Sequence, residues 1–350
     1  MRETDYAYAV AYTHTLENRM LKKADYDSLL GMGSFAEAVR FLADKGWGGA
    51  GWQMEAAGAL SQNESMDAAP KEHNTDADAM LKAEQAYIWS EVKNACPKDA
   101  PDATVLPFNI LLYQNDFHNL KTILKAVFSG AAFRPLMLEP NTVSPEAMHQ
   151  AIAAGKPDAL PEPFKTPAAE AYRALAREED GQFAEIILDK ALFNAMKEIA
   201  EETNSDFLVG WMDLNIALMN MKIALRGSYG GKSKEFLRAA MLNCKRINAD
   251  ALAEAAGREV PAVVQVFANS GFDDAAKAAQ VSPAAFERWC DNRMIKHAQL
   301  TRYKTFGFEP ILGFLVLKQF ELQAVRIILS GLRGGVPAEV LRGRMRDLHD

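Results

Sequence analysis

The stretch LPFNILLYQNDFHNLKTILKAVF (106–128) decides the fold of this chain. Its apolar residues return every three or four positions, at Ile110, Tyr113, Phe117, Leu120 and Leu124. This spacing places them on one face of an α-helix, whereas a half-buried strand alternates apolar and polar residues. The stretch therefore predicts a long helix with one buried face.

The same stripe occurs twice more along the chain. The positions 101 residues later are Trp211, Leu214, Leu218, Met221 and Leu225. Those 205 residues later are Leu315, Lys318, Leu322, Val325 and Leu329, of which only the lysine is polar. Flanking polar residues keep this register, and the aligned sets are Lys121 with Lys222 and Arg326, Asn119 with Asn220, and Asp116 with Glu321. Internal repeats of this kind indicate a structural unit that is used three times.

A shorter helix pattern also recurs, at 34–47, 143–157 and 259–272, each ending near a glycine. Any two amphipathic helices match at some offset, but two independent sets in alternating order are much less easily accidental. We therefore predict three similar helical units over 51–165, 166–280 and 281–350. Residues 1–50 are expected to supply an N-terminal helix and to complete the third unit, which closes the chain into a pseudo-threefold funnel or ring.

Helical spacing continues over most of the sequence, and the predicted fold class is all-α. The loops are expected at 58–76, 94–107 and 156–167, which are polar or rich in proline. The predicted helices are 3–22, 34–45, 78–94, 106–128, 144–154, 167–178, 182–202, 206–227, 233–242, 248–256, 260–269, 282–300, 309–330 and 336–346. Glycines are expected to end helices in the left-handed conformation at Gly46, Gly130, Gly155, Gly227, Gly271 and Gly331.

Composition excludes several classes of protein. The chain has 39 Lys and Arg against 46 Asp and Glu, a net charge of −7 without a basic block, which argues against a nucleic-acid partner. Its three cysteines, Cys96, Cys244 and Cys290, are odd in number and far apart, so they form neither a disulfide framework nor a CxxC metal site, which favours a reducing compartment. The N-terminus lacks the pattern of a signal peptide, and the apolar runs are shorter than a membrane span.

Catalytic and metal motifs are also missing from the sequence. The glycine-rich stretches GMGSFA (31–36) and GSYGGKSK (227–234) follow helical rather than strand patterns, so neither predicts a phosphate-binding loop. The six histidines have no pair at helical metal-ligand spacing. An ordinary, partly buried histidine is the favoured interpretation of His118. We therefore predict no catalytic residue, cofactor, metal or small-molecule substrate.

The aligned cations Lys121, Lys222 and Arg326, together with Arg226, are the predicted partner-binding residues. The plainer alternative is that they are ordinary exposed helix residues. Arg326 differs from the others because it lies in the apolar run AVRIILSG (324–331), where a cation is expected to have a carboxylate partner in its own chain or in another.

Several segments resemble the C subunits of the V-type and archaeal-type rotary ATPases, which are equivalent to the d subunit of eukaryotic vacuolar enzymes. The main one is GFEPILGFLVLKQFELQAVRIILSGLRGGVPAEVLRGRMRDL (307–348), with Glu309-Pro310, Glu321 and Arg326. The others are DYAYAVAYTHTLENRML (5–21), NDFHNLKTILKA (115–126) and WMDLNIALMNMKIALRG (211–227). They are spread over nearly the whole chain and occur in the order of that family.

This resemblance implies a fold and a role. The family is all-helical and has three similar domains in a funnel. It implies a non-catalytic adaptor of the rotor that receives the central stalk, subunits D and F, and sits on the membrane rotor ring at the cytoplasmic face. It further implies that torque passes through this peripheral protein during ATP-coupled H⁺ or Na⁺ transport. Two rivals stay open: a free-standing helical-repeat scaffold for soluble partners, and a helical enzyme with an unrecognised site.

Overall fold

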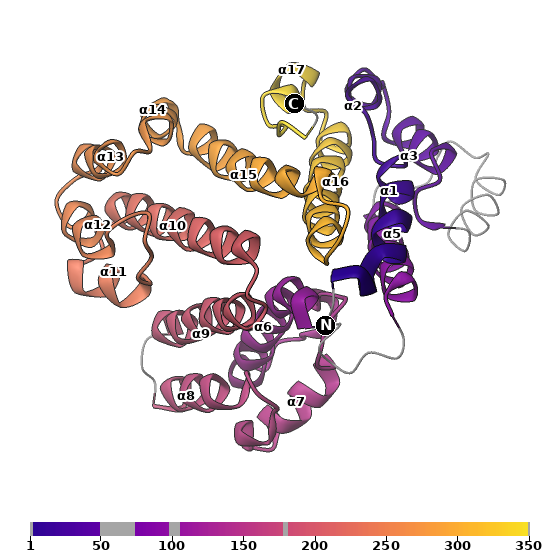
Figure 1. Cartoon of the computed structure of the whole chain (residues 1–350). Coiled ribbons are helices and arrows are strands. Elements are labelled where there is room, and N and C mark those ends of the chain that lie inside the picture. Colours follow the sequence, from indigo (N-terminus) through magenta and orange to yellow (C-terminus); the bar gives the residue numbers. More distant parts are fainter. Residues whose placement is uncertain (1–2, 50–73, 98–105, 178–180, 349–350) are drawn as a thin grey trace. The chain divides into compact units, whose positions relative to one another are not determined.

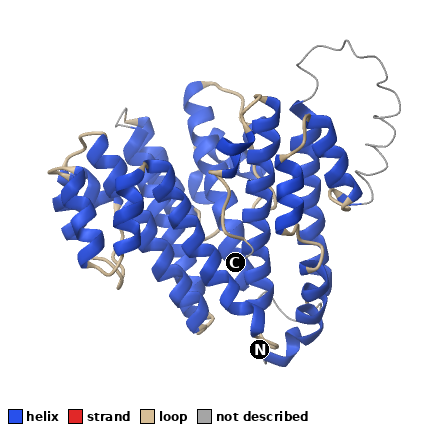
Figure 2. Ribbon diagram, turned by 90° about the horizontal axis from the view of Figure 1, so that it is seen from above, coloured by secondary structure: helices blue, strands red, loops and turns tan. Residues whose placement is uncertain are grey.

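The computed structural model describes residues 3–49, 74–97, 106–177 and 181–348. Every regular element in these ranges is a helix, which confirms the all-α prediction (Figure 2). Of the predicted loops, residues 58–73 and 98–105 lie outside the described part of the chain.

The chain divides into two compact units. Unit 1 combines residues 1–104 with 291–350, and unit 2 consists of residues 105–290. The division into three repeats with the predicted boundaries stays a prediction, as does the funnel or ring.

Unit 1 brings the two ends of the chain together. Helices α1 and α16, indigo and yellow in Figure 1, pack against each other, and α16 also contacts α3 and α5. Their apolar stripes meet in a core that includes Val10, Leu42 and Val325. The helices of unit 1 are η1 (Glu3–Tyr6), α1 (Ala7–Glu17), α2 (Lys23–Leu30), α3 (Phe35–Asp44), α5 (Asn74–Ala95), η5 (Leu300–Tyr303), α16 (Glu309–Arg333) and α17 (Ala338–Arg342).

Unit 2 is built on two long helices, α6 (Leu106–Ser129) and α10 (Asp206–Tyr229). Helix α9 packs against both, and the stripe of α6 is buried against α7, α8 and α9 around Phe117 and Phe164, whose rings lie 5.0 Å apart. The remaining helices are η3 (Arg134–Leu136), α7 (Pro145–Ala153), η4 (Pro157–Ala159), α8 (Lys165–Ala176), α9 (Gly181–Glu202), α11 (Lys234–Ala240), α12 (Ala249–Ala256), α13 (Val260–Asn269), α14 (Asp273–Val281) and α15 (Pro283–Gln299), the last of which continues into unit 1.

Glycines end the repeated helices in the same way. Gly46, Gly155 and Gly271 follow the short helices α3, α7 and α13 with φ of +85°, +67° and +79°. In each case the next residue donates to a helix carbonyl five positions back, as Trp47 N does to Leu42 O at 3.1 Å. This bond is part of the Schellman arrangement, in which a left-handed residue satisfies the last carbonyls of a helix. The predicted stops at these glycines are confirmed.

The ends of the long helices repeat as well. Gly130, Gly231 and Gly335 have φ of +74°, +60° and +63° after α6, α10 and α16, and they are spaced 101 and 104 residues apart, as the apolar stripes are. The spacing of the repeats in the sequence therefore also relates positions with the same backbone conformation.

Two predicted helix stops were wrong. Gly227 and Gly331 lie inside α10 and α16, and neither has a positive φ. A Cβ on Gly227 would overlap Leu237 of α11, and one on Gly331 would overlap Leu341 of α17. These glycines permit a close approach of the following short helix, and their 104-residue spacing matches that of the two leucines.

Helix α14 was not predicted. Its sequence DDAAKAAQV buries only the small residues Ala275, Ala276 and Ala279, so no large apolar side chain marks its buried face. The helix is fixed instead by packing against α13.

Helix α10 is long and apolar enough to cross a membrane by length and composition, which the apolar runs of the sequence did not suggest. Of its most apolar window, 61% is buried inside the protein. This burial is typical of a core helix, whose apolar side chains are covered by other helices rather than by lipid.

Candidate functional site

The predicted partner-binding residue Lys121 is paired within unit 2. Its ammonium on α6 contacts the carboxylate of Asp189 on α9, and one turn further Lys125 contacts Glu185 in the same way. The two pairs join α6 to α9 along one side. Such half-exposed pairs contribute little to stability, about 0–1 kcal/mol each, so a charged partner can compete for them.

Lys222 and Arg226 share one carboxylate. They lie one turn apart on α10 and contact Glu287 of α15 at 3.0 and 2.6 Å. Burial alone raises the pKa of Glu287, but the two cations outweigh burial and hold this pKa below its ordinary value. The Arg226 side chain is 74% exposed, so this pair leaves a cation at the surface.

Arg326 has different surroundings. It is exposed on α16 and lines a small cavity with Asp78 of α5 and Phe35 of α3. Among the described residues no carboxylate lies within 4.0 Å of its guanidinium, so the expected partner within the chain is not found there. Arg326 is therefore the predicted residue most available to another protein. Of the four predicted residues, the structure joins only Lys222 and Arg226 through a common partner.

A buried charge network around Lys318 was not predicted from the sequence. This residue occupies the one polar position in the third apolar stripe, which was the available signal. Its ammonium lies 2.7 Å from Glu84 Oε1 of α5 and 2.5 Å from Glu321 Oε2 of α16. It also lies 4.3 Å from the centre of the Trp47 ring, a cation–π contact.

Backbone groups complete this network. Leu21 N donates to Glu321 Oε1 at 2.6 Å, and Gly48 N donates to Glu84 Oε2 at 2.9 Å. Burial raises the pKa of Glu321, whereas the pKa of Lys318 is raised because the two carboxylates outweigh burial. The network ties α5, α16 and the segments before α2 and after α3 together, and it favours a charged Lys318 inside unit 1.

A second set of polar residues fixes the loops that follow the long helices of unit 2. Asn119 Oδ1 accepts from Leu138 N at 2.8 Å, and its Nδ2 donates to Leu138 O at 2.9 Å. Asn220 makes the same two bonds to Leu242, at 3.1 and 2.6 Å. The two asparagines that align in the sequence thus make the same contacts in the structure. We call each pair of bonds an asparagine clamp.

Carboxylates extend the two clamps. Asp116 accepts from Thr142 N at 3.0 Å and from Val143 N at 3.2 Å, and Asp213 accepts from Lys245 N at 2.8 Å. Burial raises the pKa of Asp116, although the hydrogen bonds from Thr142 and Val143 oppose this shift. The aligned Glu321 binds Leu21 N in unit 1, so a carboxylate or amide on each long helix holds a neighbouring backbone.

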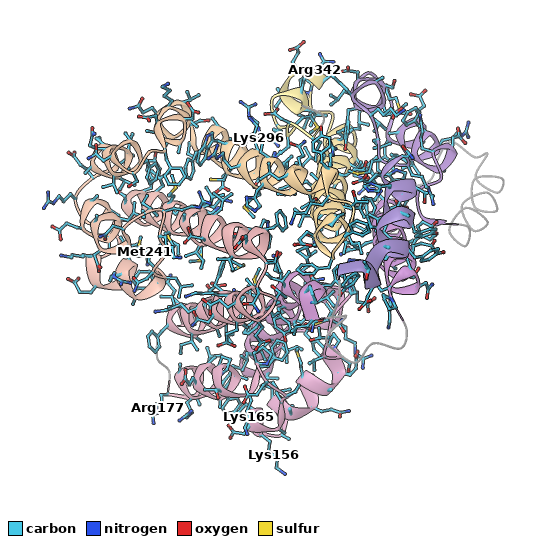
Figure 3. All side chains as sticks on the ribbon, viewed as in Figure 1. Lys156, Lys165, Arg177, Met241, Lys296 and Arg342 are labelled. Atoms are coloured by element: carbon cyan, nitrogen blue, oxygen red, sulfur yellow. The ribbon has the colours of Figure 1, made fainter. Side chains whose placement is uncertain are left out.

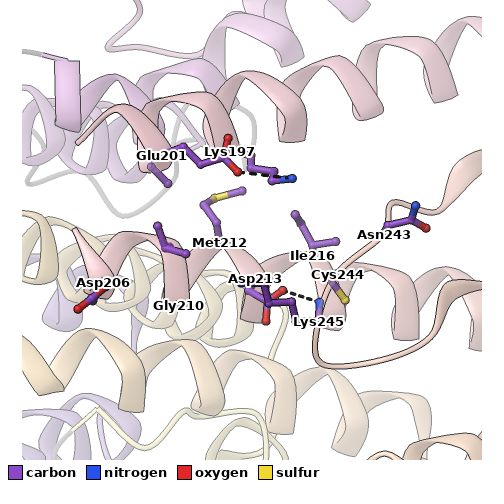
Figure 4. A pocket seen from close by; sticks show the side chains of 12 residues that line it. Lys197, Glu201, Asp206, Gly210, Met212, Asp213, Ile216, Asn243, Cys244 and Lys245 are labelled. Carbon is purple, nitrogen blue, oxygen red and sulfur yellow. Dashed lines mark hydrogen bonds and ion pairs between the residues drawn. The ribbon is translucent and has the colours of Figure 1, made fainter. Parts of the chain in front are cut away.

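An open groove of about 560 Å³ lies beside the second clamp, between α9, α10 and the loop 241–248 (Figure 4). Its apolar lining includes Val209, Met212 and Ile216 of α10. The rim is charged, and Lys197 and Glu201 pair at 3.6 Å along α9. Such a lining suits a partner segment better than a small polar substrate.

The described residues do not supply an evident reactive centre. They contain no group of three or more His, Cys, Asp or Glu side chains arranged to hold a metal ion. Burial raises the pKa of Cys96 to about 11 and also raises that of Cys244, so both thiols stay protonated and unreactive near neutral pH. The polar side chains described above form ion pairs with each other or hydrogen bonds to the backbone.

Comparison with known proteins gives the family. Residues 9–344 match the family described as the ATP synthase (C/AC39) subunit. The chain is 23% identical to the C subunit of the V-type sodium ATPase of Enterococcus hirae over 79% of this chain and 83% of that protein. It is 26% identical to the C subunit of the V-type ATP synthase of Thermus thermophilus over 63% of each chain. It is 22% identical to the C subunit of the A-type ATP synthase of Methanocaldococcus jannaschii over 98% of this chain and 86% of that protein. The chain therefore belongs to the ATP synthase (C/AC39) subunit family.

Proposed function

We propose that this chain is a non-catalytic adaptor in the rotor of a V-type or A-type ATPase. It joins the central stalk, subunits D and F, to the membrane rotor ring on the cytoplasmic face, and it transmits torque during ATP-coupled transport of H⁺ or Na⁺. The observation that carries the proposal is the family match over residues 9–344, which spans both units of the chain.

An adaptor that transmits torque must be stiff, and the buried polar contacts inside the two units favour stiffness. A part that transmits torque must not yield between its elements. Asn119 and Asn220 bind loop backbone with both amide atoms, and Lys318 bridges two helices inside unit 1. Buried polar groups that are fully bonded hold one arrangement of the backbone, because a broken bond leaves an unpaired buried group. These contacts support stiffness within each unit.

The first experiment tests membership of the rotor. The chain, tagged at its N-terminus, is expressed in its host and captured from detergent-solubilised membranes. We expect subunits D and F and the rotor ring to be recovered with it. Membranes that lack the chain should keep ATP hydrolysis and lose ATP-driven ion transport, and the purified chain should restore transport. Unchanged transport without the chain would overturn the proposal.

The second experiment tests the predicted contacts with the stalk. Arg326→Glu is the cleanest variant, since no described carboxylate pairs with Arg326. We expect it to weaken binding of purified D–F by several-fold, because a charge at an interface acts through complementarity. Lys156→Glu, at another exposed position, is the matched control. Equal binding by both variants and the unaltered chain would refute a role for Arg326.

The paired cations need a different design. Reversal of Lys121 alone places two acidic groups together, so Lys121→Asp is combined with Asp189→Lys to keep the ion pair. For the shared site, Lys222→Glu and Arg226→Glu are combined with Glu287→Lys. We expect these exchanged pairs to keep the fold and to lose stalk affinity. Retained affinity would assign these cations to internal packing alone.

The alternative function, a free-standing helical-repeat scaffold, makes an opposite prediction in the first experiment. Such a scaffold would be captured from the soluble fraction with soluble partners, and its removal would leave ion transport unchanged.

A further inference from the structure

A basic and aromatic surface lies in unit 1 where α15 ends and η5 begins. Between Asp291 and Glu309 the sequence has no acidic residue, although acidic residues outnumber basic ones in the whole chain. The cations in this interval are Arg293, Lys296, Arg302 and Lys304. The local charge is therefore opposite to the net charge of −7.

Three large apolar side chains of this surface are exposed. Leu300 is 65% exposed, Tyr303 is 93% exposed and Phe306 is 49% exposed. Lys296, Leu300 and Tyr303 are spaced by four and three residues, so they continue one exposed face from α15 into η5. The Lys296 side chain extends away from α15 in Figure 3. Exposed apolar groups of this size usually mark a contact surface.

The backbone under this surface is fixed. Thr301 is buried, and its hydroxyl donates to Ala298 O at 2.8 Å. Gly313 of α16 lies so close that a Cβ there would overlap Thr301 Oγ1 and lie 2.9 Å from Ala298 O. Further along, the Phe308 ring packs edge-on against Tyr6. The apolar side chains are thus presented by an ordered segment, which lowers the entropy lost when they bind.

Two of these cations, Lys296 and Arg302, are available for binding. Lys304 pairs with Glu309 at 3.1 Å. Lys296 and Arg302 are exposed and have no carboxylate within 4.0 Å among the described residues. Exposed charges separated by more than about 10 Å are largely screened at moderate salt. A negatively charged surface therefore responds to this local positive charge more than to the net charge of the chain.

We propose that the surface formed by Lys296, Leu300, Arg302, Tyr303 and Phe306 binds the anionic headgroup layer of a lipid bilayer. Aromatic side chains beside Lys and Arg are typical of segments that lie in the membrane interface, where rings enter the headgroup layer and cations meet lipid phosphates. The inference rests on the proposed function for its setting beside a membrane, and it adds a direct lipid contact to the protein contacts proposed there.

The test is flotation of the purified full-length chain with vesicles. One set contains phosphatidylcholine alone, and the other contains equal amounts of phosphatidylcholine and phosphatidylglycerol. We expect binding to the second set only, and a decrease when salt is raised. Each removed cation should lower the partition coefficient about fivefold. Lys296→Glu with Arg302→Glu should therefore abolish most binding, and Tyr303→Ser with Phe306→Ser should reduce it at every salt concentration.

The control variant replaces one exposed cation and one exposed aromatic residue elsewhere in the chain, Lys277→Glu with Tyr229→Ser, and should leave binding unchanged. Circular dichroism checks that each variant is folded. Absent binding, equal binding to neutral vesicles, or equal losses in test and control variants would each overturn the proposal. A test variant that still floats but no longer joins the rotor ring would assign the surface to a protein contact instead. The assay contains neither stalk nor ring proteins, so its failure leaves the proposed rotor role standing.

Discussion

At the scale of single residues, the most consequential group is the buried ammonium of Lys318. It lies between the carboxylates of Glu84 and Glu321, and all three side chains are almost fully buried. Charges in such surroundings are costly unless they are paired and hydrogen-bonded. The backbone donors Leu21 N and Gly48 N complete the pairing.

Lys318→Met should lower the free energy of unfolding by about 3–5 kcal/mol, because two carboxylates then remain buried without their cation. Urea denaturation followed by circular dichroism measures the loss. Lys197→Met, which breaks the exposed pair with Glu201, is the control and should cost about 0–1 kcal/mol. Adding Glu84→Gln and Glu321→Gln to Lys318→Met should recover much of the loss. A small effect of Lys318→Met alone would contradict a stabilising role for this ammonium.

A second prediction at this scale concerns pH. The pKa of Glu287 is held below its ordinary value of 4.5, so the unfolded chain binds a proton at this site more readily than the folded chain does. Its contribution to stability is therefore present above pH 4.5 and is lost as pH falls through the lowered pKa. Glu287→Gln should cost up to about 1 kcal/mol at neutral pH and nothing at low pH. A difference from the unaltered chain that does not shrink in acid would exclude the ion pair as its source.

At the scale of elements, each long helix of unit 2 binds the backbone of a following loop. In unit 2 the asparagine clamps fix Leu138 after α6 and Leu242 after α10. Glycines at matched positions allow the next short helix to pack closely against the long one. Gly227 of α10 does so for α11, and Gly331 of α16 does so for α17. A helix pattern alone determines neither contact, since both depend on what packs against the helix.

Asn119→Ala should speed hydrogen exchange at Leu138 N and leave Leu242 N unchanged, and Asn220→Ala should do the reverse. Each variant removes two hydrogen bonds, which together are worth about 1–3 kcal/mol, so local exchange should rise about fivefold or more. Hydrogen exchange monitored by mass spectrometry or NMR measures this. Each variant is the control for the other, and a general rise at both loops would indicate loss of unit 2 rather than release of one clamp.

At the scale of the whole molecule, unit 1 depends on segments from both ends of the chain. Helix α16 supplies the partners of α1, α3 and α5, and it carries Lys318 and Glu321. Unit 2 is continuous in sequence. A single continuous fragment of the chain therefore contains all of unit 2, whereas no such fragment contains unit 1 alone.

A fragment of residues 105–290 should be helical and should unfold cooperatively in urea. Residues 1–104 alone should not, because the apolar faces of α1, α3 and α5 and the carboxylate of Glu84 lack α16. Adding residues 291–350 to this fragment should restore a cooperative transition. Cooperative unfolding of 1–104 alone would show that α16 is not required.

Much of the fold follows from local patterns. The stripe over 106–128 predicted a helix that spans Leu106–Ser129, and the glycine stops at Gly46, Gly155 and Gly271 were confirmed. Helix α14 was not predicted because the residues on its buried face are alanines rather than large apolar side chains. The alignment of the three long helices with one another identified Lys121, Lys222 and Arg326 as candidate binding residues. It did not reveal that Lys121 and Lys222 form ion pairs within the chain.

The sequence by itself determined the all-helical class, the register of the three long helices and the family resemblance, because each is a property of residue order and spacing. Tertiary structure alone decided that Lys318 is buried between two carboxylates, that Gly227 is a packing contact rather than a helix end, and which cations remain available. The reason is that burial and ion pairing depend on residues from distant segments. Glu84 and Lys318 meet only after the two ends of the chain have packed together.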